Sequence, residues 1–315
     1  MIIVMKVIDV HTHGIGGYDT RTNVLDHILR IADIHGSHGV SEIILSVYPA
    51  KIELMREHME VVKKAIDKQN NTNSKLKVQS STRKTQHSQR KKHTSKLNTQ
   101  NLNPSSIIGV HLEGPFLNPE KSGALDKEIF IEPTEYHFEK LIEGFDDIVR
   151  IITIAPELKG ALRLIRTMSD NGIIVSMGHS DATYAEAEAG YSAGARGITH
   201  IFNAMRGFHH REPGLAGFGL LHSDVYIEVI ADPYHLDEKT LELIFRIKNP
   251  ERILIVSDTV SKSKTKGNQA ITDIHKKLSG GCLTITESSR RLIEMGFDER
   301  IIENCITKNP ARYLS

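Results

Sequence analysis

The apolar residues of this chain gather in eight short runs, each too short for a helix and continuous enough for a strand buried on both faces. These runs cover residues 7–10, 43–47, 107–110, 148–155, 173–177, 197–199, 225–231 and 252–256. Between several of them, apolar residues recur at helical spacing, over residues 24–39, 51–68, 159–171, 183–193 and 237–248. Eight strands alternating with helices predict a single (β/α)8 TIM barrel over residues 1–315, and an open doubly wound sheet fits the order less well.

One polar stretch interrupts this alternation. Residues 69–106 are rich in Ser, Thr, Gln, Asn and Lys and contain few apolar side chains. Such a segment buries too little surface to offset its ordering entropy, so we interpret it as a basic low-complexity insertion, disordered or a surface loop. From Lys68 to Ser106 there are nine Lys or Arg residues and no Asp or Glu. The stretch has no Phe, Tyr or Trp on which a base could stack, which argues against nucleic acid as a partner.

Composition restricts the class of protein. The 315 residues are 39% hydrophobic and 25% charged, which is typical of a soluble globular protein. No apolar run approaches membrane-spanning length and residues 1–6 lack the pattern of a secretory signal, so we expect a cytoplasmic protein without a membrane partner. Cys282 and Cys305 lie far from any metal-ligand spacing and are expected to be buried thiols rather than a disulfide.

Potential metal ligands stand at the C-terminal ends of the predicted strands. They are His11 and His13 on the first strand, Glu113 on the third, His179 on the fifth, His200 on the sixth and Asp258 on the eighth. These strand ends meet at one mouth of a barrel, and residues two apart in a strand share a face, so the side chains are expected to converge. Imidazole and carboxylate donors without cysteine favour a catalytic site for one or two divalent ions of Zn, Fe, Mn or Co.

A site of this composition supports hydrolysis, because a bound metal acidifies water and polarises a carbonyl group. Asp258 is placed to take the proton from that water and pass it to the leaving group. His235, after the seventh strand, is a candidate donor to the carbonyl oxygen, although a plain surface position also fits its place in the chain. The long Gly-rich segment 200–215 predicts a functional loop, in which Arg206 and Arg211 are candidates for binding an anionic group.

With these residues assembled, the chain resembles the N-acetylglucosamine-6-phosphate deacetylases of the amidohydrolase superfamily. The motifs that carry the resemblance are DVHTHG at 9–14, GVHLEGPF at 109–116 with Gly123-Ala124 following, MGHS at 177–180, THIFNAM at 199–205, HREPG at 210–214, IAD at 230–232 with His235, VSD at 256–258 and LSG at 278–280. They cover almost the whole chain except the insertion. The resemblance implies metal-dependent removal of acetate from N-acetylglucosamine 6-phosphate, which leaves glucosamine 6-phosphate in amino-sugar metabolism.

The resemblance also implies a role for each matching residue. Glu113, His179 and His200 would hold the principal metal, and His11 and His13 a second one. Asp258 corresponds to the acid and base, and His235 to the residue on the acetamide carbonyl. The positions implied to contact the substrate are Asn203, the backbone of Ala204, Arg211 (lent in the family by the other subunit of a homodimer), Ala124, Leu125, Leu278, Ser279 and Gly280.

Three departures from the family pattern leave alternatives open. The family usually has His where this chain has Leu125, which removes a polar contact to the substrate. The family also has a small β-sandwich built from both chain ends, and we expect this chain to lack most of that domain. The basic insertion has no counterpart in the family. The alternatives are a related amidohydrolase for another N-acylated amine or cyclic amide, and a diverged non-catalytic barrel with a binding role.

Overall fold

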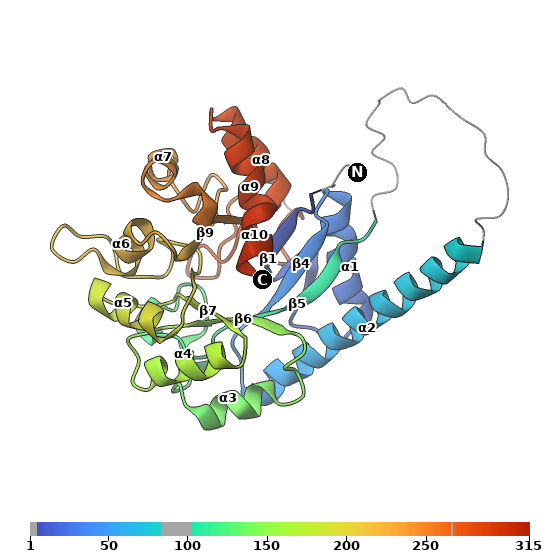
Figure 1. The fold of residues 1–315 in the computed structure, drawn as a ribbon, viewed down its shortest axis with the longest axis horizontal. Coiled ribbons are helices and arrows are strands. Elements are labelled where there is room, and N and C mark those ends of the chain that lie inside the picture. Colours follow the sequence, from blue (N-terminus) through green and yellow to red (C-terminus); the bar gives the residue numbers. More distant parts are fainter. Residues whose placement is uncertain (1–4, 83–102, 266) are drawn as a thin grey trace.

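A computed structural model describes residues 5–82, 103–265 and 267–315, and its centre is one eight-stranded parallel sheet (Figure 1). The strands in order around the sheet are β1 (Ile8–Thr12), β4 (Glu42–Val47), β5 (Ser106–Glu113), β6 (Val149–Ile154), β7 (Ile174–Met177), β8 (Gly197–Ile198), β9 (Tyr226–Ile230) and β10 (Ile253–Val256). Just beyond β10, the Asp258 N–H donates to the His11 carbonyl at 2.9 Å, which joins the last strand to the first. All eight predicted strands are present, and the predicted TIM barrel is confirmed.

Helices surround the strands in Figure 1. They are α1 (Leu25–Ser37), α2 (Ile52–Thr82), α3 (Glu135–Ile142), α4 (Ala161–Asp170), α5 (Tyr184–Ala193), α6 (Gly214–Leu221), α7 (Glu238–Ile247), α8 (Ile285–Glu294), α9 (Glu299–Ile306) and α10 (Lys308–Tyr313), with short 3-10 turns η1 (Pro119–Lys121), η2 (Lys127–Ile129) and η3 (Pro250–Arg252). A small hairpin of β2 (Gly14–Ile15) and β3 (Tyr18–Asp19) follows β1. In the described part of the chain, no helix combines the length and the apolar character needed to cross a membrane.

Helix α6 is the clearest difference from the sequence-based expectation. The sequence predicts a functional loop over residues 200–215 and no helix over 214–221. Three glycines in these eight residues lower the helix propensity. The helix forms because it is buried almost throughout and packs closely on the barrel. A Cβ added at Gly219 would lie 2.6 Å from the Ile198 Cδ1 atom, so a larger residue there would have to displace the Ile198 side chain of β8.

Helix α2 runs further than the apolar pattern predicts. We expected it to end near Lys68, and it continues to Thr82; no Gly or Pro occurs from residue 51 to 103 to stop it. The start of the predicted insertion is therefore helical, and residues 83–102 lie outside the described residues. Gln69 fixes α2 to the beginning of β5: its amide donates to the Ser105 carbonyl at 3.0 Å and accepts from the Ile107 N–H at 2.9 Å.

The barrel interior changes from apolar to polar along its axis, and this change places the site. An apolar cluster of Ile8, Val10, Ile44, Leu254 and others includes Tyr313 of α10. Buried polar side chains lie on or next to these strands, and they are Asp9, His11, His111, Thr153, Thr199 and Glu228.

Both cysteines, Cys282 and Cys305, are buried and free, as expected.

Candidate active site

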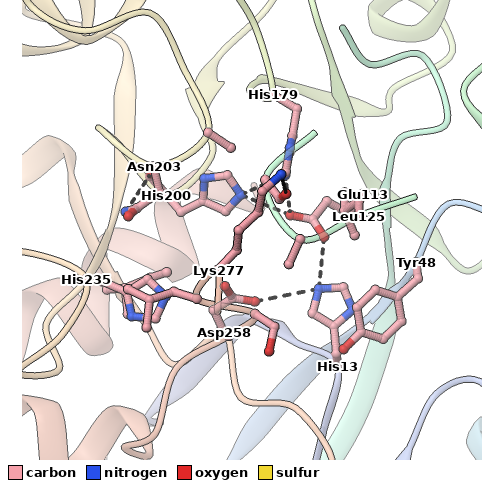
Figure 2. A pocket seen from close by; sticks show the side chains of 17 residues that line it. His13, Tyr48, Glu113, Leu125, His179, His200, Asn203, His235, Asp258 and Lys277 are labelled. Atoms are coloured by element: carbon pink, nitrogen blue, oxygen red, sulfur yellow. Dashed lines mark hydrogen bonds and ion pairs between the residues drawn. The ribbon is translucent and has the colours of Figure 1, made fainter. Parts of the chain in front are cut away.

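Three side chains from three strand ends converge on one point. The Glu113 Oε1 atom, at the end of β5, lies 3.1 Å from His179 Nε2 and 3.0 Å from His200 Nε2. The two imidazole nitrogens are 3.2 Å apart. Each of these three residues is at most 4% exposed. The predicted principal ligand set is thus assembled in the mouth of the barrel (Figure 2).

The hydrogen bonds around this group set which ring nitrogen faces inward. The Nδ1 atom of His179 lies 2.9 Å from the Lys121 carbonyl, which accepts only from a protonated Nδ1. The Nε2 atom of His179 therefore presents a lone pair to Glu113 and His200 when the ring is neutral. A histidine held in this way by a backbone carbonyl is typical of a metal ligand.

A second group lies beside the first and shares Glu113 with it. His11 Nε2 and His13 Nε2 are 3.3 Å apart, and the Asp258 Oδ1 atom lies 3.4 Å from His11 Nε2 and 3.6 Å from His13 Nε2. The other oxygen of Glu113, Oε2, is 3.0 Å from His13 Nε2. The carboxylate therefore spans the two groups with one oxygen on each, an arrangement that suits one ion or two.

Glu228, in the middle of β9, orients His11 from below. Its Oε2 atom lies 2.9 Å from His11 Nδ1, so that the protonated Nδ1 donates to the carboxylate and Nε2 faces the site. The same oxygen accepts from the His200 N–H at 3.3 Å. Glu228 was not among the sequence-predicted site residues. The sequence contained a signal for Glu228, because it is the only charged residue in the apolar run 225–231.

The donor set fits a divalent cation. In a tetrahedral zinc site the ligand atoms lie about 3.3 Å apart, and the Glu113, His179 and His200 atoms are 3.0 to 3.2 Å apart. Burial raises the pKa of Asp258 well above its usual range, and the nearby Glu113 and Glu228 carboxylates raise it further. For Glu113, burial alone would raise the pKa, but the close contacts with His13, His179 and His200 outweigh it and hold the pKa well below its usual range. Several carboxylates gathered in a buried place are stabilised by a cation.

Backbone strain is concentrated at these strand ends. His179, His200 and Asp258 all have left-handed backbone conformations, with φ of 47°, 29° and 46°. Residues without a glycine's freedom adopt such angles at a cost, and they persist where function or surrounding structure requires them. The strained turns direct three polar side chains into the mouth of the barrel instead of along the strands.

A cavity of about 250 Å³ opens above the two groups. Its wall contains His13, Glu113, His179, His200, His235 and Asp258, together with the predicted substrate positions Ala124, Leu125, Asn203, Ala204, Leu278, Ser279 and Gly280. His11 lies beneath the wall, fully buried. Arg211 is exposed and outside the wall, and Arg206 is held by the Asp181 carboxylate at 2.7 Å. The structure thus gathers all the predicted site residues except the two candidate arginines, Arg206 and Arg211.

His235 is held by Asp232, which was predicted as part of a motif and not as a site residue. Asp232 accepts from His235 Nδ1 at 3.0 Å, and also from the His235, Tyr234 and Cys282 N–H groups. Burial alone would raise the pKa of Asp232, but its hydrogen bond and charge interaction with His235 outweigh this and lower it below the usual range. The Nε2 atom of His235 is left to face the cavity, as a donor when the ring is charged.

Two further residues of the cavity wall, Tyr48 and Lys277, were not predicted from the sequence. Tyr48 directly follows β4 and its ring stacks on His13, with centroids 3.8 Å apart, so its place at a strand end was an available signal. Lys277 belongs to the long segment between β10 and α8, and no pattern in the sequence placed it at the cavity.

Comparison with known proteins confirms the predicted resemblance, although no family model matches the sequence. The chain is similar to N-acetylglucosamine-6-phosphate deacetylase of Bacillus subtilis, with 34% identity over 225 residues, 67% of this chain and 57% of that protein. The enzyme of the same name from Vibrio furnissii is 30% identical over 81% of this chain and 55% of its own length. N-acetylgalactosamine-6-phosphate deacetylase of Escherichia coli is 36% identical over 50% of this chain and 41% of its own length. The chain spans a little over half the length of the first two relatives.

A solved structure of N-acetyl-D-glucosamine-6-phosphate deacetylase from Mycobacterium smegmatis, a mutant in complex with N-acetyl-D-glucosamine 6-phosphate, has the same fold. The two structures align with a TM-score of 0.82 and 24% identity, over 99% of this chain and 77% of that one. At this level of identity the likeness establishes the shared barrel.

Proposed function

We propose that this protein is a metal-dependent hydrolase that removes acetate from N-acetylglucosamine 6-phosphate and yields glucosamine 6-phosphate. The observation that carries the proposal is the convergence of Glu113, His179 and His200 within 3.2 Å of one another in an open cavity. Asp258 and His235 stand in the wall of the same cavity. The names of the relatives at 30 to 39% identity support this choice of substrate.

Glu113, His179 and His200 would hold the principal divalent ion, Zn, Fe, Mn or Co, and His11 and His13 would hold a second where two are present. When bound, a divalent cation supplies a Lewis acid that polarises the amide carbonyl and acidifies the attacking water. Asp258 takes a proton from that water and then delivers it to the amine nitrogen as the carbon–nitrogen bond breaks. His235, charged and held by Asp232, donates from Nε2 to the carbonyl oxygen as negative charge develops there.

The remaining walls would hold the sugar phosphate. We assign the phosphate side to Asn203 and the backbone of Ala204, and the sugar ring to Ala124, Leu125 and the segment 278–280. Arg211, exposed and outside its own chain's cavity, is in our proposal lent to the site of a second copy in a homodimer. We further propose a cytoplasmic location, where phosphorylated amino sugars occur.

Leu125 favours a second candidate within the same chemistry. It packs beside Tyr48, Val260 and Cys282 and presents an apolar surface to the cavity where the family usually has His. A relative that acts on the galactosamine isomer shows a similar degree of identity, so a different phosphorylated N-acetyl sugar is the alternative substrate. A non-catalytic barrel is less well supported, because nothing in a binding role requires the full ligand set with Asp258.

The test is acetate release by the metal-loaded protein. We expect release from N-acetylglucosamine 6-phosphate, and a loss of about 10²- to 10⁴-fold in kcat for Asp258→Asn, since it removes the proton carrier. Asp126→Asn, an exposed acid on the same side of the barrel, is the matched control and should retain activity. Release only from N-acetylgalactosamine 6-phosphate would select the alternative, and release equal in Asp258→Asn and the wild type would refute the assignment.

A further inference from the structure

The wall of the catalytic cavity contains one lysine or arginine among the residues that the structure describes, and it is Lys277. The same wall carries the Glu113 and Asp258 carboxylates, which repel an anionic ligand. Leu125 adds no hydrogen-bond donor, and Arg211 lies outside the wall. Among the described residues of the wall, the Lys277 ammonium is therefore the lysine or arginine cation that a single copy offers to a phosphate.

The Lys277 ammonium lies beside Gly123, where the segments assigned to the sugar ring meet Ala204, which is assigned to the phosphate. Its Nζ donates to the Gly123 carbonyl at 3.0 Å, and the side chain extends across the opening (Figure 2). Gly123 in turn faces Ala204: a Cβ added at Gly123 would lie 3.4 Å from the Ala204 Cβ. One hydrogen bond to Gly123 leaves two of the three ammonium protons available to a ligand.

We propose that Lys277 binds the phosphate of the substrate and so determines the preference for a phosphorylated over a neutral sugar. This inference rests on the proposed function. The ammonium pairs with the phosphate oxygens as the sugar enters between the Gly123 and Ala204 segments, a charge-assisted contact that the carboxylates of the site do not provide. Lys277 belongs to the same chain as Leu125, and it supplies a polar contact to the substrate that the Leu125 side chain cannot make.

A neighbouring cavity of about 380 Å³ offers the competing location. It shares Tyr48, Ala124, Leu125 and Ser279 with the first cavity and contains Arg21 and Lys262. Arg21 is already engaged, since its guanidinium donates to both oxygens of Asp19 at 3.0 and 2.9 Å. Lys262 is exposed. Lys262→Met is thus the matched control for Lys277→Met, with the same change of charge and shape one cavity away.

The experiment compares the metal-loaded wild type with Lys277→Met, Lys277→Arg and Lys262→Met. Calorimetry measures the binding of glucosamine 6-phosphate and of glucosamine, and acetate assays give kcat and KM for N-acetylglucosamine with and without the phosphate. For Lys277→Met we expect Kd for glucosamine 6-phosphate and KM for the phosphorylated substrate to rise about tenfold. Its kcat, and its kcat/KM on the neutral sugar, should stay within about twofold. Lys277→Arg should restore most of the affinity.

Three results would overturn the inference: unchanged affinity in Lys277→Met, a loss in Lys262→Met instead, or an equal loss for phosphorylated and neutral sugars, which indicates a structural role. Failure of the proposed function is seen separately, because the calorimetry requires no turnover. A wild type that releases no acetate but binds glucosamine 6-phosphate through Lys277 refutes the function and keeps the inference. A wild type that does not bind the sugar phosphate refutes the inference.

Discussion

Asp232 illustrates how one carboxylate can control a neighbouring imidazole. It accepts from the side chain and the backbone of His235 and from the Cys282 N–H, and so it joins the loop after β9 to the loop that carries Gly280. Because Asp232 accepts from Nδ1 of His235, Nε2 can donate only when both ring nitrogens carry a proton. An Asn at position 232 keeps one acceptor oxygen and removes the negative charge that faces the His235 ring.

For Asp232→Asn we therefore expect kcat to fall about 10²-fold with little change in KM, because a donor to the developing oxyanion is lost. Acetate release measures both parameters. The control is the double variant with His235→Asn. If Asp232 acts through His235, adding Asp232→Asn to His235→Asn has little further effect on kcat. If the two substitutions instead lower kcat independently of each other, Asp232 does not act through His235.

At the scale of elements, strand ends were predictable and loops were not. Buried parallel strands read as continuous apolar runs, and a His or Glu at such an end is visible in sequence, which is why Glu113, His179 and His200 were found. Helix α6 was missed because tertiary burial outweighs the low propensity of its glycines. Lys277 was missed because its place depends on how a long segment folds back over the mouth, and no local pattern encodes that.

Helix α1 carries a pH-dependent contribution to stability through His35. Burial lowers the pKa of His35 to about 3, with the nearby His38 adding to the effect, and its Nε2 lies 3.1 Å from the Thr12 hydroxyl. Between pH 6.5 and 3 the unfolded chain binds a proton that the folded chain does not, so stability falls as pH falls through this window. From pH 7 to pH 5 this one group removes about 2 kcal/mol from the free energy of unfolding.

For His35→Gln we expect the free energy of unfolding to fall less from pH 7 to pH 5 than in the wild type, by about 2 kcal/mol. Urea denaturation at the two pH values measures it. His27→Gln, on the exposed face of the same helix, is the control and should keep the wild-type dependence on pH. A wild-type slope in His35→Gln would show that His35 is not the group responsible.

At the scale of the whole molecule, the barrel holds both ends of the basic insertion. Gln69 on α2 is hydrogen-bonded to Ser105 and Ile107, so the chain leaves and re-enters the barrel at nearly the same place. A loop joined at close ends costs little to shorten, since closure entropy depends only weakly on length. The predicted single domain of residues 1–315 with an insertion at 69–106 remains a proposal, in which the barrel works without this segment.

Replacing residues 75–101 with a short Gly-Ser linker should accordingly leave kcat and KM for acetate release unchanged. Gln69→Ala in the same background should lower the free energy of unfolding by about 1 kcal/mol per lost hydrogen bond. Acetate assays and thermal denaturation measure the two effects. A shortened protein that has lost turnover would show that the barrel needs this segment. A full-length protein without turnover that binds polyanions through this segment would favour the non-catalytic alternative.

The most direct test of the metal site is a crystal structure of the zinc-loaded protein with glucosamine 6-phosphate, recorded with anomalous scattering at the zinc edge. We predict a peak in the mouth of the barrel, about 2.0–2.2 Å from Glu113 Oε1, His179 Nε2 and His200 Nε2. A mouth that contains only water while the protein takes up zinc elsewhere would contradict the account.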